Sequence, residues 1–109
     1  MGRLTTHVLD TAAGRPAAGV RYELFALDGA RRRLAEGRTN ADGRADAPLL
    51  EGAALVAGRY ELIFEVGSYF SRAPFLDDVP VRFVVADAEQ HYHVPLLVSP
   101  WSYTTYRGS

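Results

Sequence analysis

Cysteine and lysine are both absent from this 109-residue chain. Without cysteine the chain can form no disulfide, bind no metal through a thiolate and offer no thiol nucleophile. Without lysine it can form no Schiff base on a side chain, and all twelve basic residues are arginines. The groups left to carry chemistry are three histidines, one well-placed arginine and the C-terminal segment.

A large charge of one sign is lacking as well. The formal net charge is −1 and the only basic run is Arg31-Arg32-Arg33, so nothing favours a nucleic-acid or anionic membrane partner. We expect that run to be the solvated end of a hairpin. No apolar stretch is long enough to span a bilayer, and residues 1–7 lack the apolar region of a signal peptide. A soluble protein in the cytoplasm is the expectation.

The apolar residues recur with a period of two rather than 3.6, which indicates strands. The clearest strand is 58–66, and Asp28-Gly29 predicts a hairpin between strands 20–27 and 33–39. Seven or eight short strands separated by Gly and Pro turns indicate one all-β sandwich domain over residues 1–109. The expected strands cover 4–9, 20–27, 33–39, 58–66, 79–86, 91–98 and 102–107, with a short segment after Arg44.

One segment breaks the alternation. Residues 67–75 can hold no more than one or two helical turns, because Pro74 would end a helix there. A single short helix is therefore expected beside the strands. Asp10 and Asp42 are most simply turn residues.

Alternation places two histidines on an outer face of the sandwich. In strand 91–98, His91 and His93 share a face with Pro95, opposite the apolar positions of the core. His7 likewise alternates away from its apolar neighbours. Two such histidines can be plain surface residues, but a proline within a strand is unusual because it cannot donate to the ladder. The core-facing residues of that strand are Tyr92, Val94, Leu96 and Val98.

The histidines and serines could in principle form two other kinds of site. Three neutral imidazoles and a water can form a catalytic zinc site, but an arginine in the same place would oppose a dication, so we expect no metal. A serine hydrolase is not supported, since no serine lies in a Gly-x-Ser-x-Gly turn.

The chain end is unusual. Tyr106-Arg107-Gly108-Ser109 follows the last strand without the composition of a linker. Its final three residues are not a Ser-Lys-Leu peroxisomal address. We therefore expect the end of the chain to be part of the structure.

Four segments carry a resemblance to a known family. They are residues 4–11 (LTTHVLDT), 39–44 (TNADGR), 91–97 (HYHVPLL) and the terminal Tyr106–Ser109 (YRGS). Together they resemble the 5-hydroxyisourate hydrolases, the transthyretin-related enzymes of urate breakdown. The resemblance covers nearly the whole chain, and the terminal tetrapeptide separates these enzymes from the hormone-carrying transthyretins.

The resemblance implies a prealbumin-like (transthyretin-like) sandwich of two four-stranded sheets with one short helix. It also implies a homotetramer, a dimer of dimers, with active sites at the mouths of a central channel. The reaction would be hydrolytic opening of the cyclic amide of 5-hydroxyisourate in purine catabolism, without a cofactor. The product would be 2-oxo-4-hydroxy-4-carboxy-5-ureidoimidazoline.

The same resemblance assigns the site residues. Catalysis falls to His7, Arg44, His93 and Ser109. Substrate binding falls to these four and to Tyr106, Arg107 and Gly108. The reaction needs a base for water and a donor for the developing oxyanion.

We expect His7, with Arg44 and Ser109, to activate the water, and His93 to orient or polarise the substrate. An arginine next to a histidine disfavours the imidazolium form and keeps the base competent. The roles of His7 and His93 could be exchanged, because the sequence gives no distances. Tyr106 would close the channel below the site, and His91 would lie at its rim.

One departure and two alternatives remain. The stretch 69–80 is a few residues shorter than is usual for such enzymes. The helix and its loop should therefore be smaller, but they lie away from the site. A non-catalytic carrier of an aromatic ligand is one alternative, although Tyr106 and the histidine pair count against it. A β-sandwich accessory module is the other, although such a module would need neither His7 nor His93.

Overall fold

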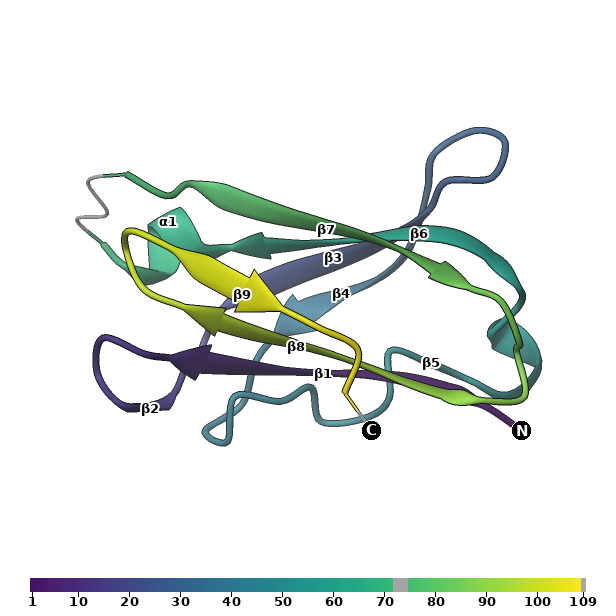
Figure 1. Ribbon diagram of the computed structural model, residues 1–109, viewed down its shortest axis with the longest axis horizontal. Coiled ribbons are helices and arrows are strands. Elements are labelled where there is room, and N and C mark those ends of the chain that lie inside the picture. The colour runs from purple at the N-terminus through teal and green to yellow at the C-terminus, as the bar shows by residue number, and fades with distance from the viewer. Residues whose placement is uncertain (72–74, 109) are drawn as a thin grey trace.

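Two β-sheets pack face to face in the computed structural model, which describes residues 1–71 and 75–108 (Figure 1). The first sheet has the order β2-β1-β8-β9, and the short strand β5 pairs with the start of β1. The second has the order β4-β3-β6-β7. The first sheet contains β1 (Arg3–Asp10), β2 (Arg15–Pro16), β5 (Leu50–Glu51), β8 (His91–Val98) and β9 (Tyr103–Thr105). The second contains β3 (Arg21–Ala26), β4 (Arg32–Arg38), β6 (Gly58–Glu65) and β7 (Asp78–Val85). The predicted sandwich is confirmed, with β5 as a small addition.

The core lies between the sheets and follows the alternation of the sequence. In β1 every second residue is buried, and β8 buries Tyr92, Val94, Leu96 and Val98 as predicted. On the second sheet, Tyr60, Leu62 and Phe64 of β6 face the same core. Apolar side chains on both inner faces exclude water from the space between the sheets, which is the main source of stability for such a fold.

Two strands at the centre of the first sheet position the site. β1 and β8 run parallel, although 80 or more residues separate their paired positions. Their register sets Thr5 beside His93 and His7 beside Pro95. All four residues therefore belong to the outer face of this sheet.

The predicted hairpin at Asp28-Gly29 is confirmed, since β3 and β4 are antiparallel and Gly29 has a φ of 78°. The basic run that follows is exposed, but it is not simply solvated. Arg31 makes an ion pair of 2.8 Å with Glu61 and lies 3.7 Å above the ring of Phe25. The run is therefore exposed at the hairpin end, as expected, and Arg31 is in addition held by the buried carboxylate of Glu61 on β6.

A single short α-helix is present in the described residues, as predicted. α1 (Val66–Tyr69) is one turn, and the 3₁₀ turn η1 (Gly52–Ala54) follows β5. The predicted stop at Pro74 lies outside the described residues. The hydroxyl of Tyr69 donates a 2.7 Å hydrogen bond to Asp10, which ties α1 to the end of β1. Asp10 also accepts the backbone N–H groups of Ala12 and Ala13, which confirms its place in a turn.

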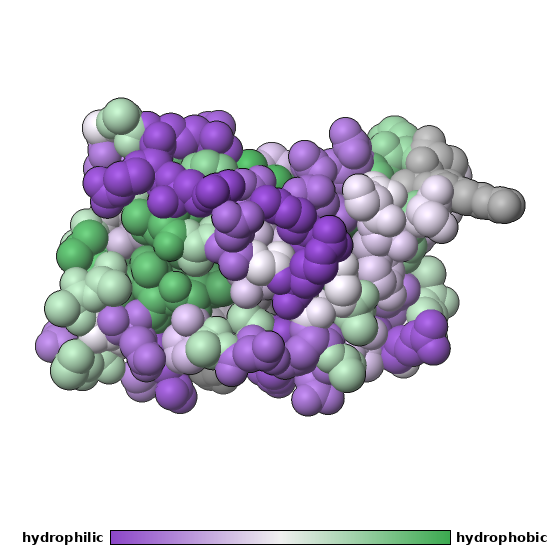
Figure 2. Space-filling model, turned by 180° about the vertical axis from the view of Figure 1, so that it is seen from behind, coloured by the Kyte–Doolittle hydropathy of each residue, from purple (hydrophilic) through white to green (hydrophobic). Residues whose placement is uncertain are grey.

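The surface of the molecule is not uniform. Seen from behind, it carries strongly hydrophilic residues across much of its area and apolar residues gathered toward one end (Figure 2). In residues 1–71 and 75–108, no helix has the length and apolar character needed to cross a bilayer.

Candidate active site

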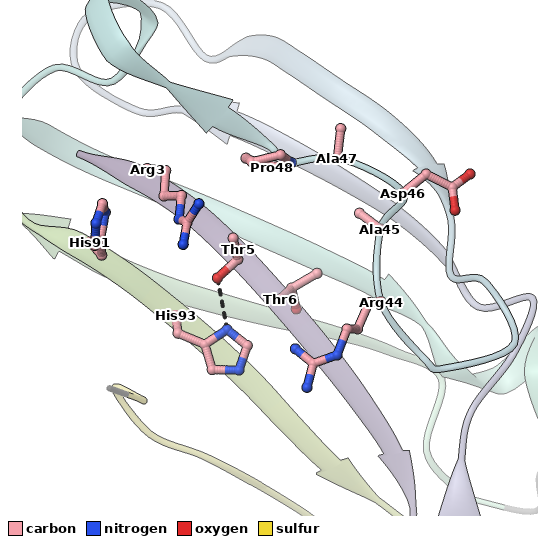
Figure 3. Close-up of a pocket in the computed structure, with 10 residues that line it drawn as sticks. All are labelled: Arg3, Thr5, Thr6, Arg44, Ala45, Asp46, Ala47, Pro48, His91 and His93. Atoms are coloured by element: carbon pink, nitrogen blue, oxygen red, sulfur yellow. Dashed lines mark hydrogen bonds between the residues drawn. The ribbon is translucent and has the colours of Figure 1, made fainter. Parts of the chain in front are cut away.

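A cavity of about 450 Å³ lies on the outer face of the first sheet (Figure 3). Its lining comes from three segments that are far apart in the sequence. β1 contributes Arg3, Thr5 and Thr6, β8 contributes His91 and His93, and the loop 44–48 contributes Arg44. Figure 3 shows the guanidinium of Arg44 and the imidazole of His93 turned toward one another.

The strand register explains why the two histidines are neighbours on the sheet, although only His93 is among the residues that line the cavity. His7 and His93 are both half-buried on the outer face, as alternation predicted. Thr5 is opposite His93, and Pro95 is opposite His7. The two histidines therefore lie diagonally across the β1–β8 pair, on the same face of the sheet. Pro95 is itself buried, which suits a residue that cannot donate to a ladder.

A tight turn carries Arg44 to the same place. The side chain of Asn40 accepts the backbone N–H groups of Asp42 and Arg44 at 2.9 and 3.1 Å. Gly43 has a φ of 76°, and a Cβ there would lie 2.4 Å from the carbonyl oxygen of Val8. Only glycine permits this close approach to β1. The turn thus pairs Arg44 with His7 in an isolated β-bridge.

The C-terminal segment reaches the site from the other side. β9 ends at Thr105, but its register with β8 continues, so that Gly108 pairs with His93. The N–H of Gly108 donates a 2.7 Å hydrogen bond to the carbonyl of His93. A Cβ on Gly108 would lie 2.5 Å from Cδ2 of the His93 ring. Glycine is therefore required for the chain to lie directly against this imidazole. Ser109 lies outside the described residues, and its catalytic role stays a prediction.

Arg107 faces the opposite side of β8. Its guanidinium lies 4.3 Å above the ring of Tyr92 and donates hydrogen bonds to the side chain of Gln90 and the carbonyl of His91. These contacts hold the terminal segment in register rather than reach into the cavity. A contact between Arg107 and substrate stays a prediction.

Tyr106 borders a second cavity, of about 330 Å³, between β7 and the terminal segment. The residue is 57% exposed. Its predicted role in closing a channel requires neighbouring subunits, so that role also remains a prediction.

His91 lies at the rim, as expected. It is exposed and pairs with Arg3 at the end of the cavity nearest the N-terminus. Across the part of the chain that the structure describes, no group of three or more His, Asp and Glu side chains is placed to share a metal ion.

The electrostatics of the site act on His93. Burial lowers the pKa of the His93 imidazole, and the nearby Arg44 and His7 lower it further. Removing the ring from water and placing positive charge beside it both disfavour imidazolium. His93 is therefore neutral at pH 7. Arg44 thus acts on the pKa of His93, an effect that was not expected at this histidine.

Thr5 was not found from the sequence. Its Oγ1 lies 2.8 Å from Nδ1 of His93, in a hydrogen bond between two half-buried groups. The sequence feature that could have pointed to Thr5 is its alternation with the core residues, which puts it on the same face as His7. The missing information was the pairing of β1 with β8.

The two sheets, their order and a histidine-arginine site on an outer face define the chain as a transthyretin-like β sandwich with the groups of a hydrolytic enzyme. The sequence matches the HIUase/Transthyretin family over residues 4–108. The chain belongs to this family.

Close relatives bear one name. The 5-hydroxyisourate hydrolase of Ralstonia nicotianae is 60% identical, with 100% of each chain covered. The 5-hydroxyisourate hydrolase 2 of Rhizobium meliloti is 56% identical over 99% of this chain and 97% of that protein.

Solved structures agree with these sequences. The 5-hydroxyisourate hydrolase of Klebsiella pneumoniae superposes with a TM-score of 0.85 at 40% identity, covering 100% of both chains. Sea bream transthyretin in complex with thyroxine gives 0.88 at 30% identity, covering 97% of this chain and 94% of that one. An (S)-allantoin synthase gives 0.93 at 45% identity, and this chain spans 44% of its length.

Proposed function

We propose that this protein is a 5-hydroxyisourate hydrolase of urate breakdown. The observation that carries the proposal is the pair of β-bridges, His7 with Arg44 and His93 with Gly108, of which Arg44 and His93 line one cavity. Full-length relatives at 56 to 60% identity bear that enzyme's name. The site thus has groups suited to hydrolysis, and the names of the relatives indicate the substrate.

The reaction is an amide hydrolysis. The oxygen of a water molecule bonds to the ring carbonyl carbon, and the carbon–nitrogen bond of the cyclic amide then breaks. The nitrogen takes up a proton and becomes part of the ureido group, while the carbon becomes the carboxylate of 2-oxo-4-hydroxy-4-carboxy-5-ureidoimidazoline. Both steps pass through an oxyanion, so the site must supply a base and hydrogen-bond donors.

Arg44 and His93 are suited to the oxyanion. The guanidinium is a permanent positive charge with fixed donors. In residues 1–71 and 75–108, no carboxylate forms an ion pair with Arg44. His93, which is neutral because its pKa is lowered, can present one ring N–H beside it.

His7 is then the base that takes a proton from the attacking water, assisted by Arg44 and Ser109. Its backbone pairs with that of Arg44, which keeps the two residues side by side. The exchange of roles between His7 and His93 is tested by the pH profiles of single variants. The histidine that acts as base should remove the acid limb of kcat/KM when it is replaced.

The test of the function is an ultraviolet assay in which freshly generated 5-hydroxyisourate decays with and without the protein. We expect catalytic amounts of the protein to accelerate the decay well above the spontaneous rate, in buffer treated with a chelator. Decay at the spontaneous rate in the presence of folded protein would remove the proposal.

We also propose that the active form is a homotetramer, a dimer of dimers. The outer face of the first sheet carries Leu9 and Leu97, which are partly exposed in the isolated chain, beside the buried Pro95. Strands β7 and β9 are open edges of their sheets, with Val84 62% and Tyr103 43% exposed beside them. Open edges and apolar residues favour contacts with further copies. Light scattering should give four times the mass of the 12.0 kDa chain.

A carrier function is the second candidate, because sea bream transthyretin, solved with thyroxine, shares the fold at 30% identity. A carrier needs an apolar channel rather than an arginine beside two histidines. Binding of an aromatic ligand without any effect on 5-hydroxyisourate would favour this alternative. The cytoplasmic location and the lack of nucleic-acid and membrane partners stay predictions.

A further inference from the structure

Thr5 is the hydrogen-bond partner of the His93 ring. The parallel register of β1 and β8 sets the two residues directly opposite each other, and Oγ1 lies 2.8 Å from Nδ1 (Figure 3). Both side chains are half-buried. The bond is therefore shielded from water on part of its surface, which strengthens it relative to an exposed one.

The other sides of the ring are also defined. Gly108 packs against Cγ and Cδ2, so close that a Cβ could not be accommodated. Nδ1 is occupied by Thr5, and Nε2 is turned toward the guanidinium of Arg44 (Figure 3). The ring nitrogen that can meet a substrate is therefore Nε2.

We infer that Thr5 is a positioning residue whose hydroxyl donates to Nδ1 of His93 and so keeps the ring proton on Nε2. His93 then offers an N–H to the developing oxyanion beside Arg44. This inference rests on the proposed hydrolysis for its kinetic consequence, whereas the position of the proton can be observed without any substrate.

The charge state of His93 makes the position of its proton matter. The groups that face the ring are Arg44 from the loop and His7 from β1, with Arg3 and His91 further along the cavity. Asp46 is the one acidic residue of that lining within the described chain. Burial, Arg44 and His7 lower the pKa of His93, so the neutral ring carries one proton, which resides on either nitrogen.

The hydroxyl of Thr5 decides between the two nitrogens. Within residues 1–71 and 75–108, the Thr5 hydroxyl has no other hydrogen-bond partner than Nδ1. With the proton on Nε2, the hydroxyl donates to Nδ1 and both groups are satisfied. With the proton on Nδ1, the hydroxyl would accept a hydrogen bond from Nδ1–H. The hydrogen of the hydroxyl itself would then have only water as a partner. A half-buried site favours the first arrangement, because an unmade hydrogen bond there is costly.

The test compares Thr5→Val with Thr5→Ser. Valine keeps the branched shape and removes the hydroxyl, whereas serine keeps the hydroxyl. We expect Thr5→Val to lower kcat by about tenfold with little change in KM, the scale of one lost hydrogen bond that acts in the transition state. Thr5→Ser should retain most of the activity. If serine loses as much as valine, the side chain acts by packing and the inference is overturned.

The matched control is Thr11→Val. Thr11 also uses its hydroxyl across the β1–β8 pair, donating to the carbonyl of Val98 at 3.1 Å, but at the end of the sheet away from the cavity. The same substitution there should leave kcat at its wild-type value. An equal loss in both variants would assign the effect to the stability of the sheet.

A double variant separates positioning from structure. Once His93→Ala has removed the ring, adding Thr5→Val should cause no further loss, because the two residues act as a unit. A further tenfold loss would show that Thr5 acts independently of His93.

Nitrogen NMR of histidine-labelled protein gives the direct readout. The chain has three histidines, so His93→Ala identifies the signals of His93 by difference. In wild-type protein we expect His93 protonated at Nε2 and not at Nδ1, and a mixture of both forms in Thr5→Val. Protonation at Nδ1 in the wild type would overturn the inference even if hydrolysis proceeds. Absence of hydrolysis with Nε2 protonated would overturn the proposed function and leave the positioning intact.

Discussion

The two outer faces of the sandwich use charge in opposite ways. On the second sheet, Arg21 makes ion pairs with Glu36 at 2.7 Å and Glu65 at 3.0 Å, and Glu61 is held between two arginines. On the first sheet, the outer face carries histidine, threonine and proline around Arg44. One face neutralises its charges within the chain, and the other leaves the positive charge of Arg44 beside the neutral ring of His93.

Two titratable groups show the difference most clearly. Hydrogen bonds from Arg31 and Arg82 lower the pKa of Glu61, even though burial alone would raise it. The pKa of His93 is also lowered, by burial and by the positive charge of Arg44. A lowered pKa keeps a carboxyl group charged but keeps an imidazole neutral. Glu61 thus stays charged and paired with its arginines. His93 stays neutral and can form a hydrogen bond with a ligand.

The largest expected effect comes from the histidines of the first face. His93→Ala and His7→Ala should each lower kcat/KM by about 10²-fold or more, the scale of a lost base or oxyanion donor. Steady-state decay of 5-hydroxyisourate measures it, with circular dichroism to show that the fold is kept. His91→Ala, at the rim, should lose much less. Wild-type activity in either of the first two variants would remove that histidine from the site.

Gly108→Ala should follow, with a loss of roughly tenfold to 10²-fold, because the added Cβ displaces the imidazole of His93 from its productive position. The same assay applies. Gly19→Ala is the control: a Cβ at Gly19 meets no atom of the described residues within 4 Å, although Gly19, unlike Gly108, has a positive φ, of 79°. It should cost about 1 kcal/mol of stability and no activity. Normal turnover by Gly108→Ala would show that the ring tolerates movement.

Glu61→Gln tests the second face. Its side chain is 5% exposed between two arginines, so the loss of the charge should cost about 2 kcal/mol of unfolding free energy at pH 7, with activity unchanged. Because the folded-state pKa of Glu61 lies below its unfolded value, its contribution is present at neutral pH. It disappears as the pH falls through the folded-state pKa.

Urea unfolding of the wild type and of Glu61→Gln, at pH 7 and in acid, measures the contribution of the Glu61 charge to stability. The difference in stability between wild type and Glu61→Gln should shrink in acid. Asp28→Asn, at a more exposed ion pair, should have a smaller effect. A difference that is constant with pH would show that the charge of Glu61 contributes nothing.

The smallest effect concerns pH. Since the pKa of His93 is lowered, its neutral form persists below the ordinary value of 6.5. Arg44→Gln removes one cause of the lowering, so the pKa of His93, followed through the NMR signals of its ring, should move to higher pH. A pKa that does not move would mean that burial and His7 lower it without Arg44.

Alternation and turn residues predicted much of this structure. They gave the sandwich, the hairpin at Asp28-Gly29, and the outer-face positions of His7 and His93. The sequence 39–44 predicted a turn that delivers Arg44, because Asn and Gly have specific roles in such turns. The terminal tetrapeptide supplied the resemblance to the enzyme.

What could not be predicted depends on which strands are neighbours. Alternation fixes the face on which a side chain lies but not the residue beside it. The parallel pairing of β1 with β8 joins residues 88 apart, and it alone brings Thr5 to His93. The ion pair of Arg31 with Glu61 likewise depends on the packing of a hairpin end against β6.

One measurement compares the two faces directly: the rate of 5-hydroxyisourate decay with Arg44→Ala and with Arg33→Ala. Both arginines are exposed, but Arg33 pairs with Glu23 and Glu36 on the second face. We predict a loss of about 10²-fold or more for Arg44→Ala and wild-type activity for Arg33→Ala, in proteins that unfold at similar temperatures. Equal activity of the two variants would contradict the account, because the positive charge on the first face would then have no part in the reaction.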